Sequence, residues 1–537
     1  MISRALVLQG GGPLGAYEVG AYSTLYERIS KQIKDNENVF DIIAGTSIGA
    51  INAAIIVSHV VENRRAHPSW SVLKCWEGSD KKLEKFWKER ISSDPDLRWT
   101  PYHSRWKDDR EREGWRRIYP KIATKEAARK YYSAKEFLRR GAKNVFTLER
   151  QFPLYDEKFL DNNRVDDINN LWFRYSNKPL RESIKAYAHF PIETDPYNNE
   201  PRLLLITVDI EEGETVTFDS YSKKSEYGKH NDERKTGYKY IMHYDQGLMV
   251  EHILASASIP LLYDYQRVPL RYDYAKAAKG QEQDSSPENS RPFWDGALLS
   301  NTPTRELISH HKLFWEHNTK PTASGKTVYQ MRTEQDSRKR KEYAGDLFEL
   351  LWKEMKEAVS AATRTRTGIT ETEQKESKLK ASDLDVYIIN LWPTKEEPFI
   401  QNDDYDLTKD RMFDIINYDK TGYDLKVAKF VTDYIELTRN LIQHLSKVGD
   451  KETVRKILLD DSKTESNFRE GLPRKYLDLL IGRFDVNEKL KLERKEHAED
   501  TISNKWVDLS HKTVRNLIEE GRKDCEDRLL FPQKTKK

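Results

Sequence analysis

Cysteine is almost absent from this 537-residue chain, which holds only two, Cys75 and Cys525. Two cysteines are too few for the disulfide framework of a small secreted fold, and this number fits a reducing compartment. The chain also lacks a run of about 20 apolar residues, so we expect no transmembrane helix. The apolar stretch before Gly10 is too short for a signal peptide. These absences predict a cytoplasmic protein and leave a peripheral contact with a membrane open.

A large charge of either sign is also missing. Lysine and arginine total 91, aspartate and glutamate total 88, and the formal net charge is +3. So balanced a chain gives no reason to expect a nucleic-acid partner. Apolar residues make up only 37% of the chain and charged residues 33%, where about 45–50% and about 25% are usual. At this length we expect a globular core with large, charged, mostly helical additions.

The first 60 residues alternate between short apolar runs and helical periodicity. Ala5–Leu8 and Val39–Ala44 are short and apolar, as buried strands of a parallel sheet are. Each run leads into a glycine-containing turn and then into a helical pattern, over residues 15 to about 31 and over Ile48–Val57. The order strand, turn, helix, strand, turn, helix predicts an α/β fold with a parallel sheet.

A charged and aromatic segment, from about residue 61 to residue 183, interrupts this pattern. We interpret it as a large helical insertion. Six tryptophans lie between Trp70 and Trp115. Clustered aromatic side chains usually pack a core, so we expect these to pack beneath the insertion. The alternative is a lid or a surface that faces a membrane.

Strand patterns return at Leu203–Val208, at Thr215–Phe218 and, last, at 385–391. A polar loop at 276–291 separates the last strand from the others. From residue 396 to residue 537 the pattern is charged and helical, without glycine-rich loops. We therefore expect a domain over 1–395, with its core motifs within 1–310, and a charged helical region over 396–537.

The pentapeptide Gly45-Thr46-Ser47-Ile48-Gly49 lies between an apolar strand and an alanine-rich helix. A nucleophilic serine on a strand-to-helix turn needs small neighbours, because the backbone approaches closely there. The following helix also directs its positive end toward a developing anion. We therefore predict that Ser47 is a nucleophile on an elbow formed with Gly45 and Gly49. A glycine-lined packing turn is the alternative.

A second glycine cluster, Gly10-Gly11-Gly12-Pro13-Leu14-Gly15, follows the first strand. An oxyanion hole needs backbone N–H groups near the reacting carbonyl oxygen and no side chain in the way. The same residues also match the Gly-x-Gly-x-x-Gly pattern of dinucleotide-binding sites. That pattern expects an acidic residue at the end of the next strand, where this chain has the Ser47 turn. We therefore predict an oxyanion loop made of Gly10, Gly11, Gly12 and Gly15.

The ordered motifs resemble those of the patatin-like phospholipases. That family combines a strand, three glycines and a helix with Gly-x-Ser-x-Gly and a distant Asp-Gly-Ala or Asp-Gly-Gly. Asp295-Gly296-Ala297 supplies the last motif, and Ala255–Pro260 and Asn301-Thr302-Pro303 resemble the stretches on either side of it. The resemblance covers roughly 1–310 without the insertion, together with the strand at 385–391. It implies a parallel-sheet core with helices on both faces.

The resemblance also implies an activity, the hydrolysis of lipid esters by a serine–aspartate dyad without a cofactor or a metal. Ser47 then matches the nucleophile and Asp295 the base, and Gly296 and Ala297 complete the acid motif. Burial beside Trp294 is expected to raise the pKa of Asp295, because a carboxylate is otherwise a weak base for a serine. The chain departs from the pattern in its long spacing between Ser47 and Asp295. We attribute that spacing to the insertion and the polar loop, which could gate the site.

Several alternatives stay beside this interpretation. A catalytically silent lipid-binding or scaffold protein could keep the same fold, and a dinucleotide-dependent oxidoreductase is the other enzyme class considered. A serine–histidine–aspartate triad is disfavoured, because His252 precedes the acid and His310 and His311 follow it closely. No cysteine–histidine spacing indicates zinc. Lys409 and Ile415 stand where a calcium loop needs glycine and glutamate. The sequence indicates no particular protein partner or oligomeric state.

Overall fold

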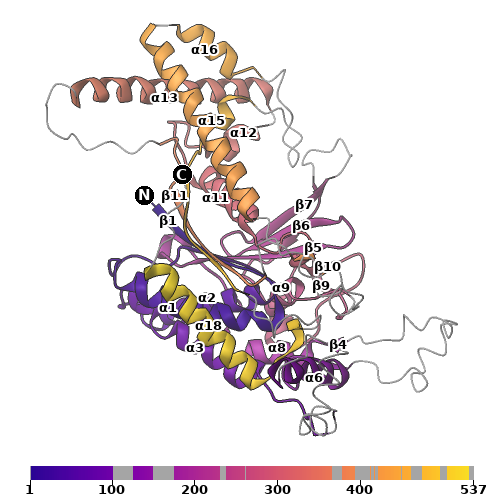
Figure 1. The fold of residues 1–537 in the computed structure, drawn as a ribbon. Helices are drawn as coiled ribbons and strands as arrows, with labels where there is room; N and C mark the ends of the chain where they lie inside the picture. The colour runs from indigo at the N-terminus through magenta and orange to yellow at the C-terminus, as the bar shows by residue number, and fades with distance from the viewer. Residues whose placement is uncertain are drawn as a thin grey trace.

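The computed structural model describes residues 2–98, 100, 125–148, 175–229, 238–260, 262–334, 336–365, 378–392, 412, 416–417, 421–448, 450–460, 475–495 and 505–530. A mostly parallel mixed sheet lies at its centre (Figure 1). The strands of this sheet within the described ranges are β1 (Ile2–Leu8), β2 (Ile42–Thr46), β5 (Arg202–Asp209), β6 (Glu214–Asp219), β9 (Gln266–Pro269), β10 (Ser290–Asp295), β11 (Asp383–Asn390) and β12 (Val486–Glu493).

Strand order explains where the two glycine turns meet. The order is β12-β11-β1-β2-β5-β10-β9, with β6 paired to β5 outside it. All neighbours from β12 to β5 run parallel, whereas β6, β9 and β10 pair antiparallel. Because β1 and β2 are parallel neighbours, the turns that follow them lie at the same edge of the sheet, where ligands of α/β folds usually bind. The predicted α/β fold with a mostly parallel sheet is confirmed.

Helices cover both faces of the sheet, as predicted (Figure 1). Successive residues of a strand point to opposite faces. Leu6 and Leu8 therefore pack in one core with the first helices, and Ala5 and Val7 pack on the other face with Leu307. The first face carries α1 (Gly15–Ser30), α2 (Ile48–Ala66), α3 (Ser79–Phe86), α9 (Val250–Ser256) and α18 (His511–Leu530), and the second face carries α11 (Thr304–Asn318).

The insertion is mostly helical in its described parts, with one short pair of strands, and it begins later than expected. Helix α2 continues to Ala66, so residues 61–66 belong to the core helix. Trp76 and Trp87 have no exposed surface and pack in the main core, so these two tryptophans do not form a separate core under the insertion. Trp99, Trp106 and Trp115 lie outside the described residues. The further elements of this part are η2 (Leu73–Trp76), η3 (Trp87–Ile91), α6 (Lys125–Arg140), β3 (Thr147–Leu148), β4 (Tyr175–Ser176) and α8 (Lys178–Lys185).

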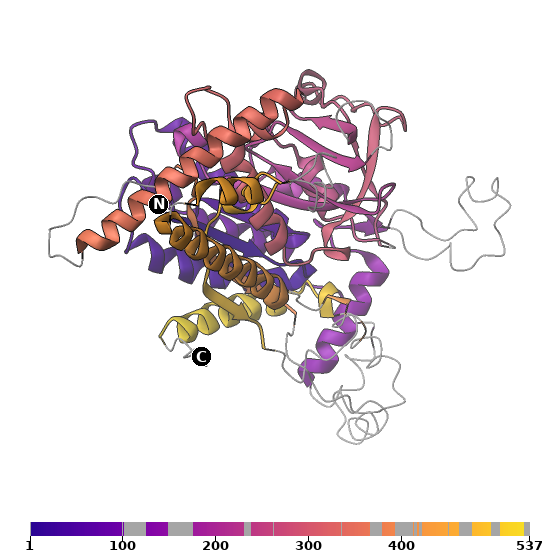
Figure 2. The same cartoon turned by 90° about the horizontal axis from the view of Figure 1, so that it is seen from above.

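A second group of helices packs beyond α11, around its own core of Phe348, Leu351, Ile442 and Leu458. Figure 2, the view from above, shows α13 running across this end of the molecule. The group contains α12 (Val328–Arg332), α13 (Ser337–Thr365), α15 (Thr421–Val448), α16 (Lys451–Leu458) and α17 (Leu477–Leu480). The remaining short elements are η1 (Gly12–Leu14), η7 (Pro196–Asn198), β7 (Lys224–Lys229), β8 (Tyr238–His243), α10 (Tyr274–Ala278), η8 (Gly296–Leu298) and η10 (Lys505–Val507).

The described parts of the region 396–537 are largely helical, as expected, but this region also returns to the sheet. Its strand β12, which the sequence did not predict, pairs parallel to β11. Its last described helix, α18, crosses α1 so closely that a Cβ atom on Gly20 would lie 1.8 Å from the carbonyl oxygen of Ile518. A Cβ atom on Gly521 would lie 2.0 Å from the carbonyl oxygen of Tyr17. The boundary at residue 395 stays a prediction. Beyond it, β12 belongs to the central sheet and α18 packs on α1.

Candidate active site

The turn between β2 and α2 holds Ser47 in a strained conformation, with φ 56° and ψ −123°. A residue other than glycine rarely adopts a positive φ, and such backbone strain concentrates at functional sites. A Cβ atom on Gly45 would lie 2.3 Å from the carbonyl oxygen of Gly49. A Cβ atom on Gly49 would lie 2.5 Å from the carbonyl oxygen of Leu8. Both glycines of the Gly-x-Ser-x-Gly pattern are therefore sterically required.

Two strand ends meet beside this turn. Both strands pair with β5. Thr46, the last residue of β2, pairs with Ile206. Asp295, at the end of the antiparallel β10, pairs with the next residue of β5, Thr207. A Cβ atom on Gly296 would lie 2.3 Å from the carbonyl oxygen of Ile206, so only glycine fits after the acid. The sheet register thus brings together Ser47 and Asp295, which are far apart in the sequence.

Asp295 is a buried carboxyl with one satisfied oxygen. Its Oδ1 accepts a hydrogen bond from the N–H of Ala297 at 2.8 Å, and its own N–H donates to the carbonyl of Ser258 at 2.9 Å. Burial raises its pKa from 3.8 to about 7, against the opposing effects of the Ser47 hydroxyl and the Ala297 N–H. Oδ2 is buried without a hydrogen bond of normal geometry. The hydroxyl is therefore near this carboxyl but not fully engaged with it, as is common before substrate binds.

The glycine loop lies against the serine. A Cβ atom on Gly10 would lie 3.0 Å from the Cβ atom of Ser47. The N–H of Gly10 donates to the carbonyl of Asn301 at 3.2 Å, and the N–H of Gly15 donates to carbonyls of its own turn. Gly11 and Gly12 donate no hydrogen bond within the described chain. Of the four predicted loop glycines, these two have N–H groups available for an oxyanion.

The sequence did not single out the residues that hold the turn and the loop in place. The N–H of Ser47 donates to the hydroxyl of Ser256 at 3.0 Å. The indole N–H of Trp392, just after β11, donates to the carbonyl of Gly10 at 2.8 Å. Gln9 donates to the hydroxyl of Thr302 at 2.8 Å and accepts from the backbone N–H of Trp392. Ser256 and Thr302 were noted only as parts of motifs, and no local pattern indicated Gln9 or Trp392.

An apolar cavity opens at Ser47. It measures about 660 Å³ when counted out to its open mouth. Ile48 and Ile51 of α2 line its inner side. The glycine loop, the segment 257–263, the insertion and the last part of the chain supply the rest of the wall, so the insertion is one of several parts that enclose the space beside the serine. The wall includes Trp87, Leu138, Phe146, Tyr175, Leu180 and Leu509.

The histidines near the acid motif have other partners. His252 accepts a hydrogen bond from the N–H of Met249 at 2.9 Å, and burial lowers its pKa to about 4. Its ring centroid lies 4.7 Å from that of Phe218, within the core. The Nε2 atom of His311 lies 2.8 Å from the carbonyl oxygen of Ser382. In the structure, these two histidines contact Met249, Phe218 and Ser382.

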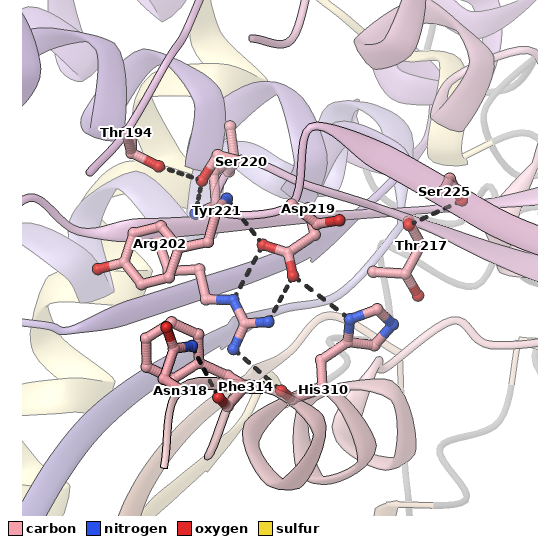
Figure 3. Close-up of polar contacts among 12 residues, drawn as sticks. Thr194, Arg202, Thr217, Asp219, Ser220, Tyr221, Ser225, His310, Phe314 and Asn318 are labelled. Carbon is pink, nitrogen blue, oxygen red and sulfur yellow. Dashed lines mark hydrogen bonds and ion pairs between the residues drawn. The ribbon is translucent and has the colours of Figure 1, made fainter. Parts of the chain in front are cut away.

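His310 belongs to a buried ionic cluster at the beginning of β5, shown in Figure 3. Its Nδ1 atom lies 3.5 Å from a carboxylate oxygen of Asp219, which also forms a two-pronged ion pair with Arg202. The guanidinium holds the pKa of Asp219 well below its usual range despite burial. Arg202 begins β5, whereas Thr207 near the end of this strand borders the site. The cluster therefore joins β5, β6 and α11 at the end of β5 that lies away from Ser47.

The described residues contain neither a cluster of potential metal ligands nor a helix suited to span a membrane. Within the described ranges, no group of three or more His, Cys, Asp or Glu side chains is arranged to bind a metal. The rejected calcium-loop residues, 404–410, lie outside the described residues. Among the helices that the structure describes, none is long and apolar enough to span a bilayer. Cys75 and Cys525 are buried free thiols.

Comparison with known proteins gives one informative match. A family model for patatin-like phospholipases matches residues 6–308, more than half of the chain. No curated protein sequence matches. Among solved structures, VipD from Legionella pneumophila is similar at 11% identity, over 96% of this chain and 67% of that chain, with a TM-score of 0.21. So low a score carries no argument about fold or function. On the family match, the chain belongs to the patatin-like phospholipase family.

Proposed function

We propose that the protein is a serine acyl hydrolase that cleaves carboxylic esters of lipids, with Ser47 as nucleophile and Asp295 as base. One arrangement carries the proposal: a serine on a strained elbow adjoins a buried carboxyl with a pKa of about 7, at the mouth of an apolar cavity. Family membership supports the acyl-hydrolase class. A lipid substrate is supported by the apolar wall.

In the first step, the Asp295 carboxylate takes the proton of Ser47 while the serine oxygen attacks the ester carbonyl. A carboxyl with a pKa of about 7 is a far better base than an ordinary aspartate with a pKa near 3.8, and it is still ionised in half or more of the molecules above that pH. The tetrahedral intermediate places its negative oxygen near the N–H groups of Gly11 and Gly12. The N–H of Ile48, the first in α2, is a further donor at this turn.

Collapse of this intermediate releases the alcohol, which takes the proton from Asp295, and leaves an acyl group on Ser47. Water then attacks the acyl-enzyme while Asp295 accepts a proton from it. The bond between the acyl carbon and the Ser47 oxygen breaks, Ser47 takes that proton from Asp295, and the carboxylic acid leaves. The acyl chain extends into the cavity between α2 and the insertion. Burial of each methylene there contributes about 0.8 kcal/mol, so chain length is expected to influence KM and kcat/KM strongly.

The test is covalent labelling with a fluorophosphonate probe, followed by hydrolysis of esters of increasing acyl length. Ser47→Ala is expected to abolish both labelling and turnover, and Asp295→Asn to lower turnover by about 100-fold or more. Ser30→Ala and Asp245→Asn serve as matched controls, because both residues lie on the surface away from the site. Circular dichroism verifies that each variant is folded.

The catalytically silent alternative makes the opposite prediction. A well-folded wild-type chain that neither reacts with the probe nor hydrolyses any ester, yet binds fatty-acyl ligands, would replace the hydrolase proposal with a lipid-binding protein of the same fold. Labelling that persists in Ser47→Ala would show that a different residue is the nucleophile.

A further inference from the structure

Helix α15 exposes an apolar stripe along its length. Eight of its large apolar side chains are between 42% and 72% exposed. Their main spacings alternate between four and three residues, which is the heptad pattern of a coiled-coil seam. We call this set the α15 seam, and it consists of Tyr423, Val427, Phe430, Tyr434, Leu437 and Leu441 at the heptad positions, with Val431 and Leu445 beside them.

The opposite side of α15 already packs against its own chain. Ile442 is buried in the core of the second helix group, and Ile435 packs against that core. Leu425 packs against the core under the sheet. The helix is therefore apolar on two sides, and among the described residues the cores of the fold use only one of them. A helix that is apolar around most of its surface is expected to be covered on most of its surface.

The seam is large for a surface that stays in water. An aromatic side chain presents roughly 150–250 Å² and an aliphatic one less, and the eight seam residues, three of them aromatic, are on average about half exposed. The seam thus offers several hundred Å² of apolar surface, more than most monomers expose in one patch. That area approaches the ~800 Å² per partner that stable interfaces bury.

The charges beside the seam help to decide whether a membrane or a second helix covers it. Acidic residues (Asp424, Asp433) and a lysine (Lys426) lie next to seam residues in the sequence. A helix that lies on an anionic membrane usually carries a lysine- and arginine-rich polar face. The mixed charge and the heptad spacing instead fit a second helix, whose side chains would interlock with those of the seam.

We propose that the α15 seam is the interface between two copies of this chain, which pair through their α15 helices as a short coiled coil. One self-complementary stripe satisfies both partners in such a symmetric contact. The pairing leaves Ser47 and its cavity untouched, because the cavity wall contains no residue of α15. The interface is therefore independent of the proposed hydrolase function.

The test measures the mass of the full chain by sedimentation velocity over a dilution series. The wild type is expected to be a dimer that dissociates on dilution, and the Phe430→Glu/Leu437→Glu double variant is expected to be a monomer throughout. Lys429→Glu introduces the same residue at an exposed position of the same helix outside the seam, and it should leave the dimer intact. Because these side chains are exposed, thermal unfolding should change little in either variant.

A second measurement locates the contact. Leu437→Cys should form a covalent dimer with a short bismaleimide crosslinker, and Lys429→Cys should not; the native cysteines are buried and provide the background. A wild-type chain that is monomeric at every concentration overturns the proposal, and so does a dimer that survives the double glutamate variant. A monomer that floats with phosphatidylcholine–phosphatidylserine vesicles, and loses this binding in the double variant, would assign the seam to a membrane instead.

Discussion

On the proposed mechanism, burial of the Asp295 carboxyl makes it a competent base for Ser47 at neutral pH. Only the ionised form can accept the serine proton, and burial raises its pKa to about 7. We therefore expect kcat/KM to fall about tenfold per pH unit below pH 6 and to level off above pH 8. Ester hydrolysis measured from pH 5 to pH 9 tests this, with circular dichroism to verify folding. A rate that stays constant down to pH 5 would show that Asp295 has an ordinary pKa or is not the base.

At the same scale, the elbow depends on the missing side chain of Gly49. Gly49→Ala places a Cβ atom 2.5 Å from the carbonyl oxygen of Leu8. Because this oxygen belongs to the backbone, it cannot rotate away as a flexible side chain could. We expect a loss of about 2–4 kcal/mol in the free energy of unfolding and nearly complete loss of turnover. Urea unfolding and ester hydrolysis measure the two effects.

Gly345→Ala is the matched control for that substitution. Gly345 lies in α13, where a Cβ atom would meet only the end of the Arg455 side chain, at 3.4 Å. Since alanine favours a helix over glycine by about 1 kcal/mol, this variant should be as stable as the wild type or more stable. If both alanine variants behaved alike, the close approach at Gly49 would have no importance for the turn.

At the scale of elements, the end of β11 positions the glycine loop through Trp392. Trp392→Phe keeps the ring but removes the N–H that donates to the carbonyl of Gly10. One such hydrogen bond is worth about 0.5–1.5 kcal/mol, so we expect kcat to fall by up to about tenfold while KM changes little. Steady-state kinetics on a short-chain ester separate the two parameters.

Trp352→Phe provides the comparison for this element. Its indole N–H is buried in α13 without a hydrogen-bond partner, so its removal should leave kcat unchanged. An equal fall of kcat in both variants would point to a general effect of tryptophan replacement. It would argue against a positioning role of Trp392 at the loop.

Local sequence patterns predicted the elements next to the site because those elements have local causes. Short apolar strands bounded by glycine, as in β1 and β2, are recognisable without tertiary information. Strand β12 was missed because its residues Val486–Glu493 alternate charged and apolar side chains with only a half-buried face, so the segment is similar to a charged helix in composition. Its place beside β11 depends on contacts between residues about 100 positions apart.

The same distinction applies to the candidate site. Ser47, Asp295 and the glycines belong to motifs, and the structure brings these motifs together, although their catalytic roles stay predictions. Gln9 and Trp392 belong to no pattern, and the hydrogen bond that occupies the Gly10 N–H comes from Asn301, nearly 300 residues away. Such contacts form only when the folded sheet brings distant segments together, so the residues next to them in the sequence do not predict them.

For the whole molecule, the last described strand and helix are parts of the core. The chain truncated after residue 395 loses β12, α18 and the cavity wall at Leu509. We therefore expect it to be insoluble or unfolded, since α1 would expose its buried contact with α18. A chain truncated after Leu530, beyond α18, should stay folded. Soluble yield and circular dichroism compare the two, and a folded, active 1–395 chain would establish that region as an independent domain.

The cavity wall at Val507 and Leu509 also determines when the protein could become active during its synthesis. At about 5–20 residues per second, these residues follow Ser47 from the ribosome after roughly 20–90 s. Throughout that interval the nascent chain has the serine turn without an enclosed space for an acyl chain. On the proposed function, the growing polypeptide is thus an inactive precursor until residues 507–509 have been synthesised and have folded onto the cavity.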